Sequence, residues 1–377
     1  RARCRVRQAV PASRAPGAPL ALVADGAMIT LGTAARIAEP LTRAGHPVLG
    51  PFAVNGEPKC AEVDAMVAGF AGAAGVIALG GGAALDAAKL AACLAAASEP
   101  ETQALDHALA ARPLPAAALP LIALPTTAGT GSEVTRTAVA TGPDGAKLWY
   151  WADALLPARV VLDPELTLSL PAHITAWTGM DAVAHALEAA SSARATPPGI
   201  AFGTAALTIL AEALPRAVAD GSDIAARGDM LWGACLAGRA IEESGTHLGH
   251  AISHALGSLA PVHHGHATAL ALEATLPWLV GTDAAATRFA PVARAIGAET
   301  PAALPARFSA LMRSVGISAA LPEAARALSS SAVAEAMQTA ANAPMLSAAP
   351  RPLDAATVAE VAALVTGLGA ASPAVPA

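Results

Sequence analysis

Aromatic residues make up only 3% of this 377-residue sequence, and charged residues only 14%. A disordered chain would be rich in charge and poor in apolar side chains, whereas 54% of this sequence is hydrophobic. The formal net charge of −6 provides no basic surface of the kind that nucleic-acid partners require. The composition therefore indicates an ordered globular protein, and we expect no nucleic-acid partner.

Cysteine is also scarce. The four cysteines are scattered, without a CxxC pair, which is typical of reduced thiols rather than of a disulfide framework. The N-terminal run RARCRVR is basic, but no apolar signal-peptide core follows it. We expect a cytoplasmic protein whose last residues, ASPAVPA, form a frayed tail.

Two uncharged stretches, residues 65–85 and 113–132, are long enough to resemble membrane spans. The first, however, contains the strand-like VIAL followed by three glycines, and the second contains four prolines. Buried strands of a parallel sheet also have continuous apolar runs. We therefore expect no membrane segment in this chain.

The first half of the chain alternates strand-like and helix-like segments. Strand patterns are found at residues 20–25, 46–50, 75–82, 120–125 and 158–167, with helical patterns near 26–44, 60–74 and 86–97. Such alternation predicts βαβ units and a mainly parallel sheet. After about Leu170 the strand patterns nearly vanish, and alanine- and leucine-rich helical segments follow. We predict an α/β domain over residues 1–168 and an all-helical domain over 169–377.

Glycines occupy the turn after one predicted strand. In GGGAALDAAK (80–89) three of them separate the strand from a helix, so the backbone can approach a pyrophosphate at the helix N-terminus. A tight turn that closes a βα unit is the alternative. The polar loop PTTAGTGSE (125–133) follows another apolar strand, and its hydroxyls can hydrogen-bond a nucleotide. Two such loops at the carboxyl ends of strands favour dinucleotide binding.

Asp25 ends the predicted strand LALVAD. A carboxylate at this position can accept hydrogen bonds from the adenosine ribose and repel a 2′-phosphate. It can equally cap the N-terminus of the following helix. The sequence leaves both roles open.

Histidines are concentrated in one part of the second half. Asp181 and His185 are four residues apart in GMDAVAHALEA (179–189), so they lie on one face of a helix. Six of the ten histidines follow within residues 247–266. An i,i+4 hydrogen-bonded pair and unrelated structural histidines are the alternative. One carboxylate with several imidazoles suits a divalent iron or zinc ion, although spacing does not choose among the histidines.

These motifs, in this order, resemble the iron-containing (group III) alcohol dehydrogenase family. The resemblance extends from about Leu20 to about Pro352 and includes ALPTTAGTGSEVTRTAV, LLPARVVLDPELTLSLP, TGMDAVAHALEA and HAISHALGSLAPVHHGHA. It implies a Rossmann-like NAD-binding domain and a helical metal-binding domain, the architecture also found in dehydroquinate synthase. It further implies a homodimer.

The resemblance also implies roles for individual residues. The metal ligands would be Asp181, His185, His250 and His264, and His254 would lie beside the metal and the nicotinamide without being a regular ligand. We take His254 as the candidate proton relay, because an unperturbed imidazole titrates near neutral pH. The implied cofactor-binding set is Asp25, Gly81, Gly82, Asp86, Thr126, Thr127 and Lys147, with the Asp25 carboxylate favouring NAD over NADP.

The sequence departs from the family pattern in three places. Ala83 replaces the usual serine after the glycines, and His263 replaces the usual proline before HG, with His266 following. The family's first strand is not recognisable before Leu20. The first departure removes a hydroxyl from the phosphate site, and the second makes the substrate side more polar.

The function predicted from the sequence is metal-dependent, NAD(P)-linked hydride transfer between a small alcohol or aldehyde and nicotinamide. Iron and zinc both fit the ligand set, and NAD is expected, with NADP as the alternative. A metal- and NAD-dependent lyase of the dehydroquinate synthase type is a second hypothesis, but it would need more basic residues to bind an anionic substrate. A degenerate binding protein of the same fold is a third.

Overall fold

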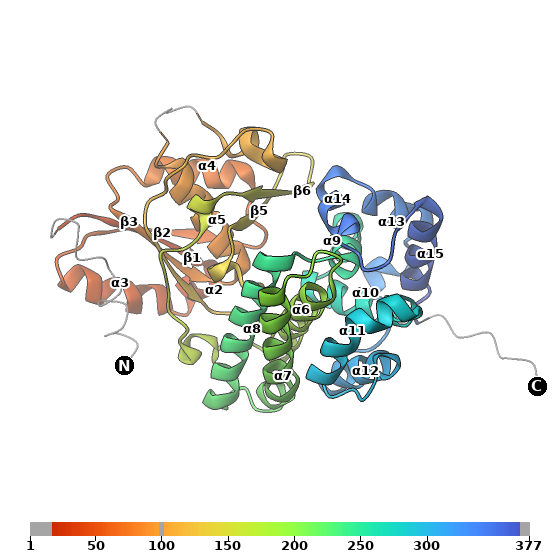
Figure 1. Cartoon of the computed structure of the whole chain (residues 1–377). Helices are drawn as coiled ribbons and strands as arrows, with labels where there is room; N and C mark the ends of the chain where they lie inside the picture. Colours follow the sequence, from red (N-terminus) through yellow and green to blue (C-terminus); the bar gives the residue numbers. More distant parts are fainter. Residues whose placement is uncertain (1–16, 98–101, 370–377) are drawn as a thin grey trace, which may run out of the picture. The chain divides into compact units, whose positions relative to one another are not determined.

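The computed structural model describes residues 17–97 and 102–369 (Figure 1). The basic N-terminal run and the ASPAVPA tail lie outside the described residues. The chain divides into two compact units, the first ending at Ser169 and the second beginning at Leu170. The predicted boundary after Leu168 lies one residue before this division.

The first unit is built around a five-stranded sheet with the order β2-β1-β3-β4-β7. All four strand pairs are parallel. The strands are β1 (Leu20–Asp25), β2 (Val48–Val54), β3 (Gly75–Gly80), β4 (Leu121–Pro125) and β7 (Arg159–Val160). β1 and β3 carry almost only apolar side chains, because both of their faces are covered.

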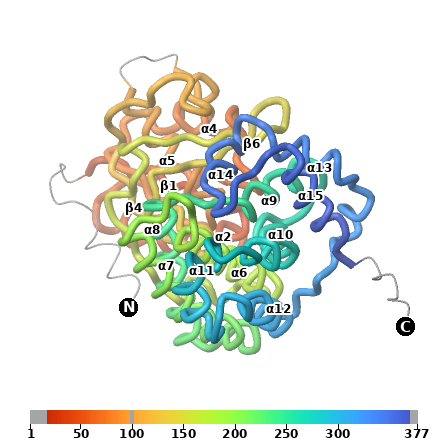
Figure 2. The backbone as a smooth tube through the Cα atoms, turned by 45° about the vertical axis from the view of Figure 1, so that its right-hand side comes forward, coloured from red at the N-terminus to blue at the C-terminus, as the bar shows by residue number. Residues whose placement is uncertain are grey.

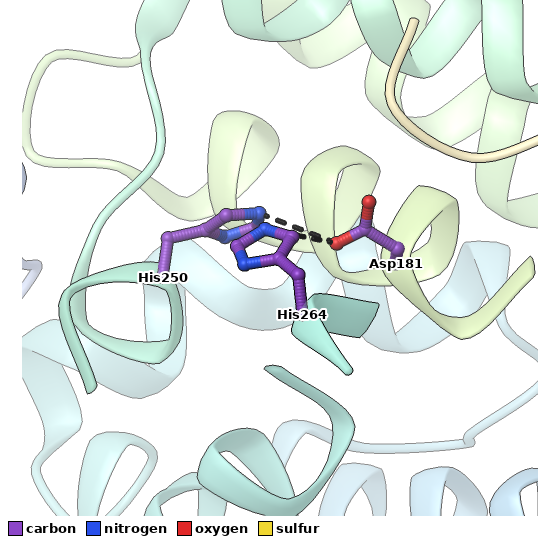
Figure 3. Close-up of side chains that lie close together, drawn as sticks. All are labelled: Asp181, His250 and His264. Atoms are coloured by element: carbon purple, nitrogen blue, oxygen red, sulfur yellow. Dashed lines mark ion pairs between the residues drawn. The ribbon is translucent and has the colours of Figure 1, made fainter. Parts of the chain in front are cut away.

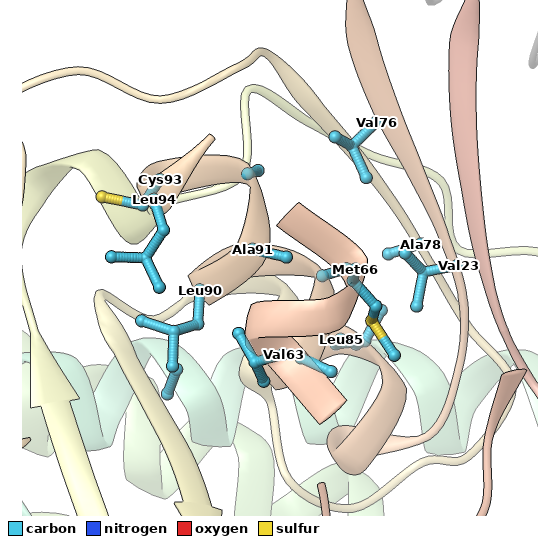
Figure 4. Close-up of a cluster of buried hydrophobic side chains, with 14 of the residues drawn as sticks. Val23, Val63, Met66, Val76, Ala78, Leu85, Leu90, Ala91, Cys93 and Leu94 are labelled. Atoms are coloured by element: carbon cyan, nitrogen blue, oxygen red, sulfur yellow. The ribbon is translucent and has the colours of Figure 1, made fainter. Parts of the chain in front are cut away.

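Alternate residues of the central strands enter two different cores. Ala21, Val23, Val76 and Ala78 pack with residues of α4 (Cys60–Gly69) and α5 (Gly82–Leu94), as Figure 4 shows in part. Leu20, Leu22, Ile77 and Leu79 pack with residues of α2 (Gly26–Thr30) and α3 (Thr33–Arg43). The period-two alternation of a strand therefore places helices on both faces of the sheet.

The strand order creates a switch point between β1 and β3. After β1 the chain moves to β2 on one side, and after β3 it moves to β4 on the opposite side, so the two connections leave the carboxyl ends of β1 and β3 in opposite directions. Ligands of open α/β sheets bind at such a position. Asp25 and Gly80 are the last residues of these two strands.

Three details of the first unit differ from the sequence prediction. A hairpin of β5 (Thr137–Thr141) and β6 (Lys147–Trp151) was not predicted. β2 continues through Pro51 to Val54, because an edge strand tolerates a residue that lacks an N–H. The strand predicted over 158–167 is limited to Arg159–Val160, and Asp163 then caps a 3-10 helix over Pro164–Thr167.

The second unit is helical, and none of its described residues forms a strand. In Figure 2 the backbone of this unit, coloured from green to blue, coils into helices along most of its length. Three long helices pack against one another: α6 (Ala172–Ser191), α7 (Pro197–Ala219) and α8 (Ile224–Ser244). The shorter helices are α9 (Leu248–Leu259), α10 (His264–Leu279), α11 (Asp283–Ala295), α12 (Leu304–Ser314), α13 (Ser330–Met337), α14 (Ala343–Ser347) and α15 (Ala355–Thr366).

One helix of the described chain, α7, is long and apolar enough to cross a membrane by length and composition. It packs along both α6 and α8, and Leu207, Leu210 and Leu214 are fully buried there. Core helices of helical domains have the same apolar character. Neither of the two stretches singled out in the sequence is a single helix, since residues 65–85 include β3 and residues 113–132 include β4.

Candidate metal centre and dinucleotide site

One face of α6 carries three ionisable side chains at the spacing i, i+4, i+7. They are Asp181, His185 and Glu188, with exposures of 3%, 6% and 0%. Side chains at these positions lie above one another along a helix. Buried carboxylates and imidazoles need partners, so this face requires complementary groups from neighbouring helices.

The complementary groups come from the starts of α9 and α10. His250 is the third residue of α9, and His264 is the first residue of α10. Their nitrogens and an Asp181 oxygen lie within 4.8 Å of one another. The Asp181 Oδ1 atom is 3.7 Å from His250 Nε2 and 3.5 Å from His264 Nε2, and all three side chains point toward one another (Figure 3).

Two of these atoms are buried without a hydrogen-bond partner among the described residues: Asp181 Oδ1 and His250 Nε2. An unsatisfied buried polar atom is costly, so the arrangement calls for a further group between them. Protein nitrogen and oxygen ligands lie about 2.0–2.2 Å from a zinc ion, and two such ligands stand some 3–4 Å apart. The observed separations therefore fit a divalent ion shared by these side chains.

The other nitrogen of each imidazole is hydrogen-bonded on the side away from Asp181. The Nδ1 atom of His250 lies 2.6 Å from Glu188 Oε2 and donates to that carboxylate, so the neutral imidazole carries its lone pair on Nε2. The Ser253 hydroxyl donates to the His264 carbonyl and lies 3.0 Å from His264 Nδ1. Such outer partners fix the tautomer and the ring orientation of metal-binding histidines.

The ionisable groups of this centre influence one another strongly. Burial raises the pKa of Asp181, but His185, His264 and His250 outweigh this effect and hold the pKa well below its usual range. Burial lowers the pKa of His250, whereas Glu188 and Asp181 raise it to about 9. The centre thus stabilises its carboxylates in the charged form, which is the form that binds a cation.

His185 lies beside this group. Its Nδ1 atom is 3.9 Å from Asp181 Oδ2, and its ring stacks on His250 with centroids 4.4 Å apart. His254 is half-buried, and its ring lies 5.5 Å from that of His264. These two positions are compatible with a fourth ligand and with a neighbouring proton relay.

The two histidines that depart from the family pattern pack on Trp177 of α6. The His266 ring is stacked on the indole at 5.2 Å with an interplanar angle of 4°, and His263 lies 5.0 Å away at a tilt. Burial lowers the pKa of His266, and the nearby His263 lowers it further. The structure therefore groups these histidines around an indole and not with Asp181.

Sequence reasoning missed Glu188 and Ser253. Glu188 lies within the helix motif that revealed Asp181 and His185, and its i+7 spacing from Asp181 was a usable signal. Ser253 offered no comparable signal, since its partner His264 belongs to the following helix.

In the first unit, the Asp25 carboxylate contacts the glycine turn. Oδ2 accepts a hydrogen bond of 2.6 Å from the Gly81 N–H. Asp25 precedes α2, but its side chain makes no capping hydrogen bond to that helix, so the capping alternative is not supported. Burial raises the pKa of Asp25, while the Gly81 N–H lowers it.

The threonine-rich loop lies directly against the glycine turn. Thr126 N donates to Gly80 O at 3.0 Å. A Cβ atom added at Gly81 would lie 3.2 Å from the Thr127 side chain, and one added at Gly82 would lie 2.6 Å from Thr130. A side chain at Gly82 would overlap Thr130, and one at Gly81 would crowd Thr127. The structure thus brings together Asp25, Gly81, Gly82, Thr126 and Thr127 at the carboxyl edge of the sheet.

The remaining two residues of the predicted cofactor set have other contacts. The Asp86 carboxylate accepts hydrogen bonds from Ser132 Oγ and from Val139 N, the latter at 2.9 Å. Lys147 Nζ lies 3.0 Å from Glu57 Oε1. Asp86 thus joins α5 to Ser132 in the loop before β5 and to β5 itself, and Lys147 joins β6 to the segment after β2.

Two family models match the chain. Residues 7–164 match the model described as iron-containing alcohol dehydrogenase, and residues 175–365 match the C-terminal model of the Fe-containing alcohol dehydrogenase family. Together they include every residue of both candidate sites. The chain belongs to the iron-containing alcohol dehydrogenase family.

Sequence relatives of this iron-containing alcohol dehydrogenase family member carry concordant names. It is 39% identical to the "Probable alcohol dehydrogenase EutG" of Escherichia coli over 67% of this chain and 64% of that protein. It is 36% identical to long-chain-alcohol dehydrogenase 1 of Geobacillus thermodenitrificans over 77% of this chain and 73% of that protein. The first of these alignments thus spans slightly less than two thirds of the relative.

Solved structures show the same fold. A sulfoacetaldehyde reductase from Bifidobacterium kashiwanohense, in complex with NAD+, superimposes with a TM-score of 0.81 at 28% identity, over 93% of this chain and 91% of that one. A 1,3-propanediol oxidoreductase superimposes with a TM-score of 0.80 at 27% identity, over 97% and 94%. The predictions of the family, of the two-part fold class and of an oxidoreductase acting on CH–OH groups are confirmed.

Proposed function

We propose that this protein is a metal-dependent, NAD-linked alcohol dehydrogenase that acts on small alcohols and aldehydes. A hydride passes between the alcohol carbon and C4 of the nicotinamide, and the hydroxyl proton is released. The observation that carries the proposal is that the side chains of Asp181, His250 and His264 converge. Two of their facing atoms, Asp181 Oδ1 and His250 Nε2, are buried without a hydrogen-bond partner among the described residues. Family membership supports the reaction class.

The predicted helical domain, residues 169–377, would hold the metal. Asp181, His250 and His264 are the ligands that the geometry supports best, and His185 is the fourth. Glu188 and Ser253 orient two of the imidazoles. When bound there, a divalent ion supplies Lewis-acid polarisation of an alcohol or carbonyl oxygen. Iron is favoured by the family name, and the same donors also suit zinc.

We assign the proton step to His254. It lies one helical turn after His250 on α9, half-buried and next to the His264 ring. An imidazole accepts and releases protons near neutral pH without a large energetic cost. The role of His254 is to take the hydroxyl proton in oxidation and to return it in reduction.

The predicted α/β domain, residues 1–168, would bind the dinucleotide. Gly81 is the N-cap residue of α5 and Gly82 is its first residue, and the N-terminal N–H groups of this helix favour a pyrophosphate. Thr126 contributes backbone atoms to this site, and Thr127 contributes a hydroxyl. Asp25 provides the carboxylate that favours NAD over NADP. Asp86 would act indirectly, by holding the loop that follows Thr127, and Lys147 would need to exchange Glu57 for the cofactor.

We further propose a cytoplasmic homodimer. Cys60, Cys93 and Cys235 are buried free thiols, as expected of a protein from a reducing compartment. Within the described sheet β2 is an edge strand, and an edge offers unpaired N–H and C=O groups to a second copy. Light scattering during size-exclusion chromatography measures the oligomeric state directly.

The activity test uses anaerobically purified protein supplied with Fe²⁺ or with Zn²⁺. Absorbance of the reduced nicotinamide is followed with a panel of short alcohols and NAD, and with the matching aldehydes and NADH. We expect turnover that requires the metal and is abolished by a chelator. Absence of turnover in both directions, from protein shown to contain metal, would contradict the proposal.

A further inference from the structure

Glu188 is the only carboxylate among the described residues that is fully buried and hydrogen-bonded to a side chain of the candidate metal centre. Its Oε2 atom accepts from His250 Nδ1 at 2.6 Å and from the His247 N–H at 2.9 Å. Its Oε1 atom accepts from the Gly249 N–H at 2.6 Å. One carboxylate of α6 therefore binds the first turn of α9 at three donors.

This arrangement is a helix cap supplied by another helix. His247 is the N-cap residue of α9, and Gly249 and His250 are its second and third residues. The first N–H groups of a helix have no partner within that helix, and the helix dipole favours a negative charge there. Glu188 accepts from the free N–H groups and places a negative charge at the N-terminus of α9. The same carboxylate also fixes the ring of His250, which lies in this first turn.

Gly249 makes the arrangement sterically feasible. A Cβ atom at this position would lie 2.8 Å from Glu188 Oε1 and 2.9 Å from the Leu272 side chain. Any larger residue would push the carboxylate away from the α9 turn. Gly257 on the same helix has nothing within 4 Å of its hypothetical Cβ, so the requirement for glycine is local.

We propose that Glu188 is a positioning residue for the metal. By accepting from Nδ1 it holds His250 in the tautomer whose Nε2 lone pair points at Asp181, and by capping α9 it fixes where that nitrogen stands. This inference rests on the proposed metal centre. It adds that the affinity of the centre for metal depends on a side chain that does not touch the metal.

The test measures Co²⁺ binding by the metal-free full chain, in competition with a chromophoric chelator and by the visible absorption of the bound Co²⁺. In Glu188→Gln the single amide oxygen can occupy only one of the two acceptor positions, so either His250 Nδ1 or the Gly249 N–H faces an NH2 group and loses its acceptor. We expect a rise in the Co²⁺ dissociation constant of about 10- to 100-fold and an altered absorption spectrum. The matched control is Glu273→Gln, which removes a carboxylate of α10 that accepts from Ser309 Oγ, and it should leave both readouts unchanged.

A second pair of variants leaves the charge in place. Gly249→Ala should weaken Co²⁺ binding in the same direction, and Gly257→Ala should not, so a folding failure of Glu188→Gln would not prevent the test. Folded Glu188→Gln protein with the affinity and spectrum of the wild type would overturn the proposal. So would equal affinities in the two alanine variants. If the wild-type protein binds no Co²⁺, the proposed metal centre itself is wrong, which is a different result.

Discussion

Gly265 of α10 lies directly against the backbone of Trp177 of α6. A Cβ atom added at Gly265 would overlap the Trp177 carbonyl oxygen and lie 3.0 Å from the Asp181 Cβ. Because backbone atoms cannot move aside like a flexible side chain, only glycine allows the two helices to approach this closely. Gly265 directly follows His264, and its contact with α6 is next to Asp181, so this contact sets how closely His264 and Asp181 approach.

Gly265→Ala should therefore separate α10 from α6 and weaken metal binding. We expect a loss of stability of about 1–3 kcal/mol from overpacking, together with reduced metal content after dialysis. Elemental analysis and thermal unfolding measure the two effects. Gly257→Ala is the control, and equal metal content in both variants would show that this contact does not set the geometry of the centre.

His264→Ala and His254→Ala should differ in kind. The first removes an atom of the ligand group, so metal content and turnover should fall together. The second should retain the metal while turnover slows by about 10²–10⁴-fold, the contribution typical of general acid–base catalysis. Equal loss of metal from the two variants would show that the assignment of these histidines is wrong.

Asp25→Gly should raise the kcat/KM ratio of NADP to NAD. The carboxylate stands at the glycine turn, where we propose that its charge repels a 2′-phosphate, and the substitution would remove that repulsion. Steady-state kinetics with both cofactors gives the ratio. An unchanged ratio would indicate that Asp25 serves the conformation of the turn through Gly81 and not cofactor choice.

Glu133 should make the stability of the protein depend on pH. The Glu133 side chain is only 3% exposed, and burial raises its pKa to about 7. Its own backbone N–H and Lys89 lower the pKa, but they offset only part of the effect of burial. A raised pKa means that the folded state binds the proton more tightly than the unfolded state, so stability is full below about pH 4.5 and declines as pH rises through 7.

Glu133→Gln should remove this decline. From the size of the shift we expect the variant to gain on the order of 2–3 kcal/mol relative to wild type between pH 5 and pH 8. Urea unfolding at a series of pH values measures it. Parallel curves for the two proteins would mean that Glu133 is not protonated in the folded state at pH 6.

Lys89→Met should destabilise the first unit. The ammonium group is fully buried and donates to the Ser132 carbonyl at 2.9 Å, to Ser132 Oγ, to Thr135 Oγ1 and to the Thr137 carbonyl, and it lies 3.8 Å from Asp86. Removing one partner of a buried ionic network costs about 3–5 kcal/mol. The exposed Lys59→Met is the control, and a comparable melting temperature for both variants would contradict this account.

The family and the fold class could be predicted from the sequence, because motif order and the alternation of strand and helix patterns are local features. Spacing also paired Asp181 with His185, whereas the choice of His250 and His264 came from the family resemblance. Asp181 and His185 are one helical turn apart wherever the helix lies. Glycines between a strand and a helix likewise predict a close backbone turn at the helix N-terminus. The strands at Leu20–Asp25 and Gly75–Gly80 were similarly evident from apolar runs ended by turn residues.

Other features needed the tertiary structure, because they join residues distant in the chain. Glu188 meets His250 across 62 positions and Asp25 meets Gly81 across 56, and no periodicity encodes either contact. The hairpin of β5 and β6 forms where α5 offers a surface for β5, although the strand sequences TAVAT and KLWYW do not strictly alternate polar and apolar residues. The sequence by itself determined which chemical groups are present and in what local order, whereas packing alone decided which of them share a buried site, since desolvation and hydrogen-bond satisfaction depend on neighbours that only the folded chain brings together.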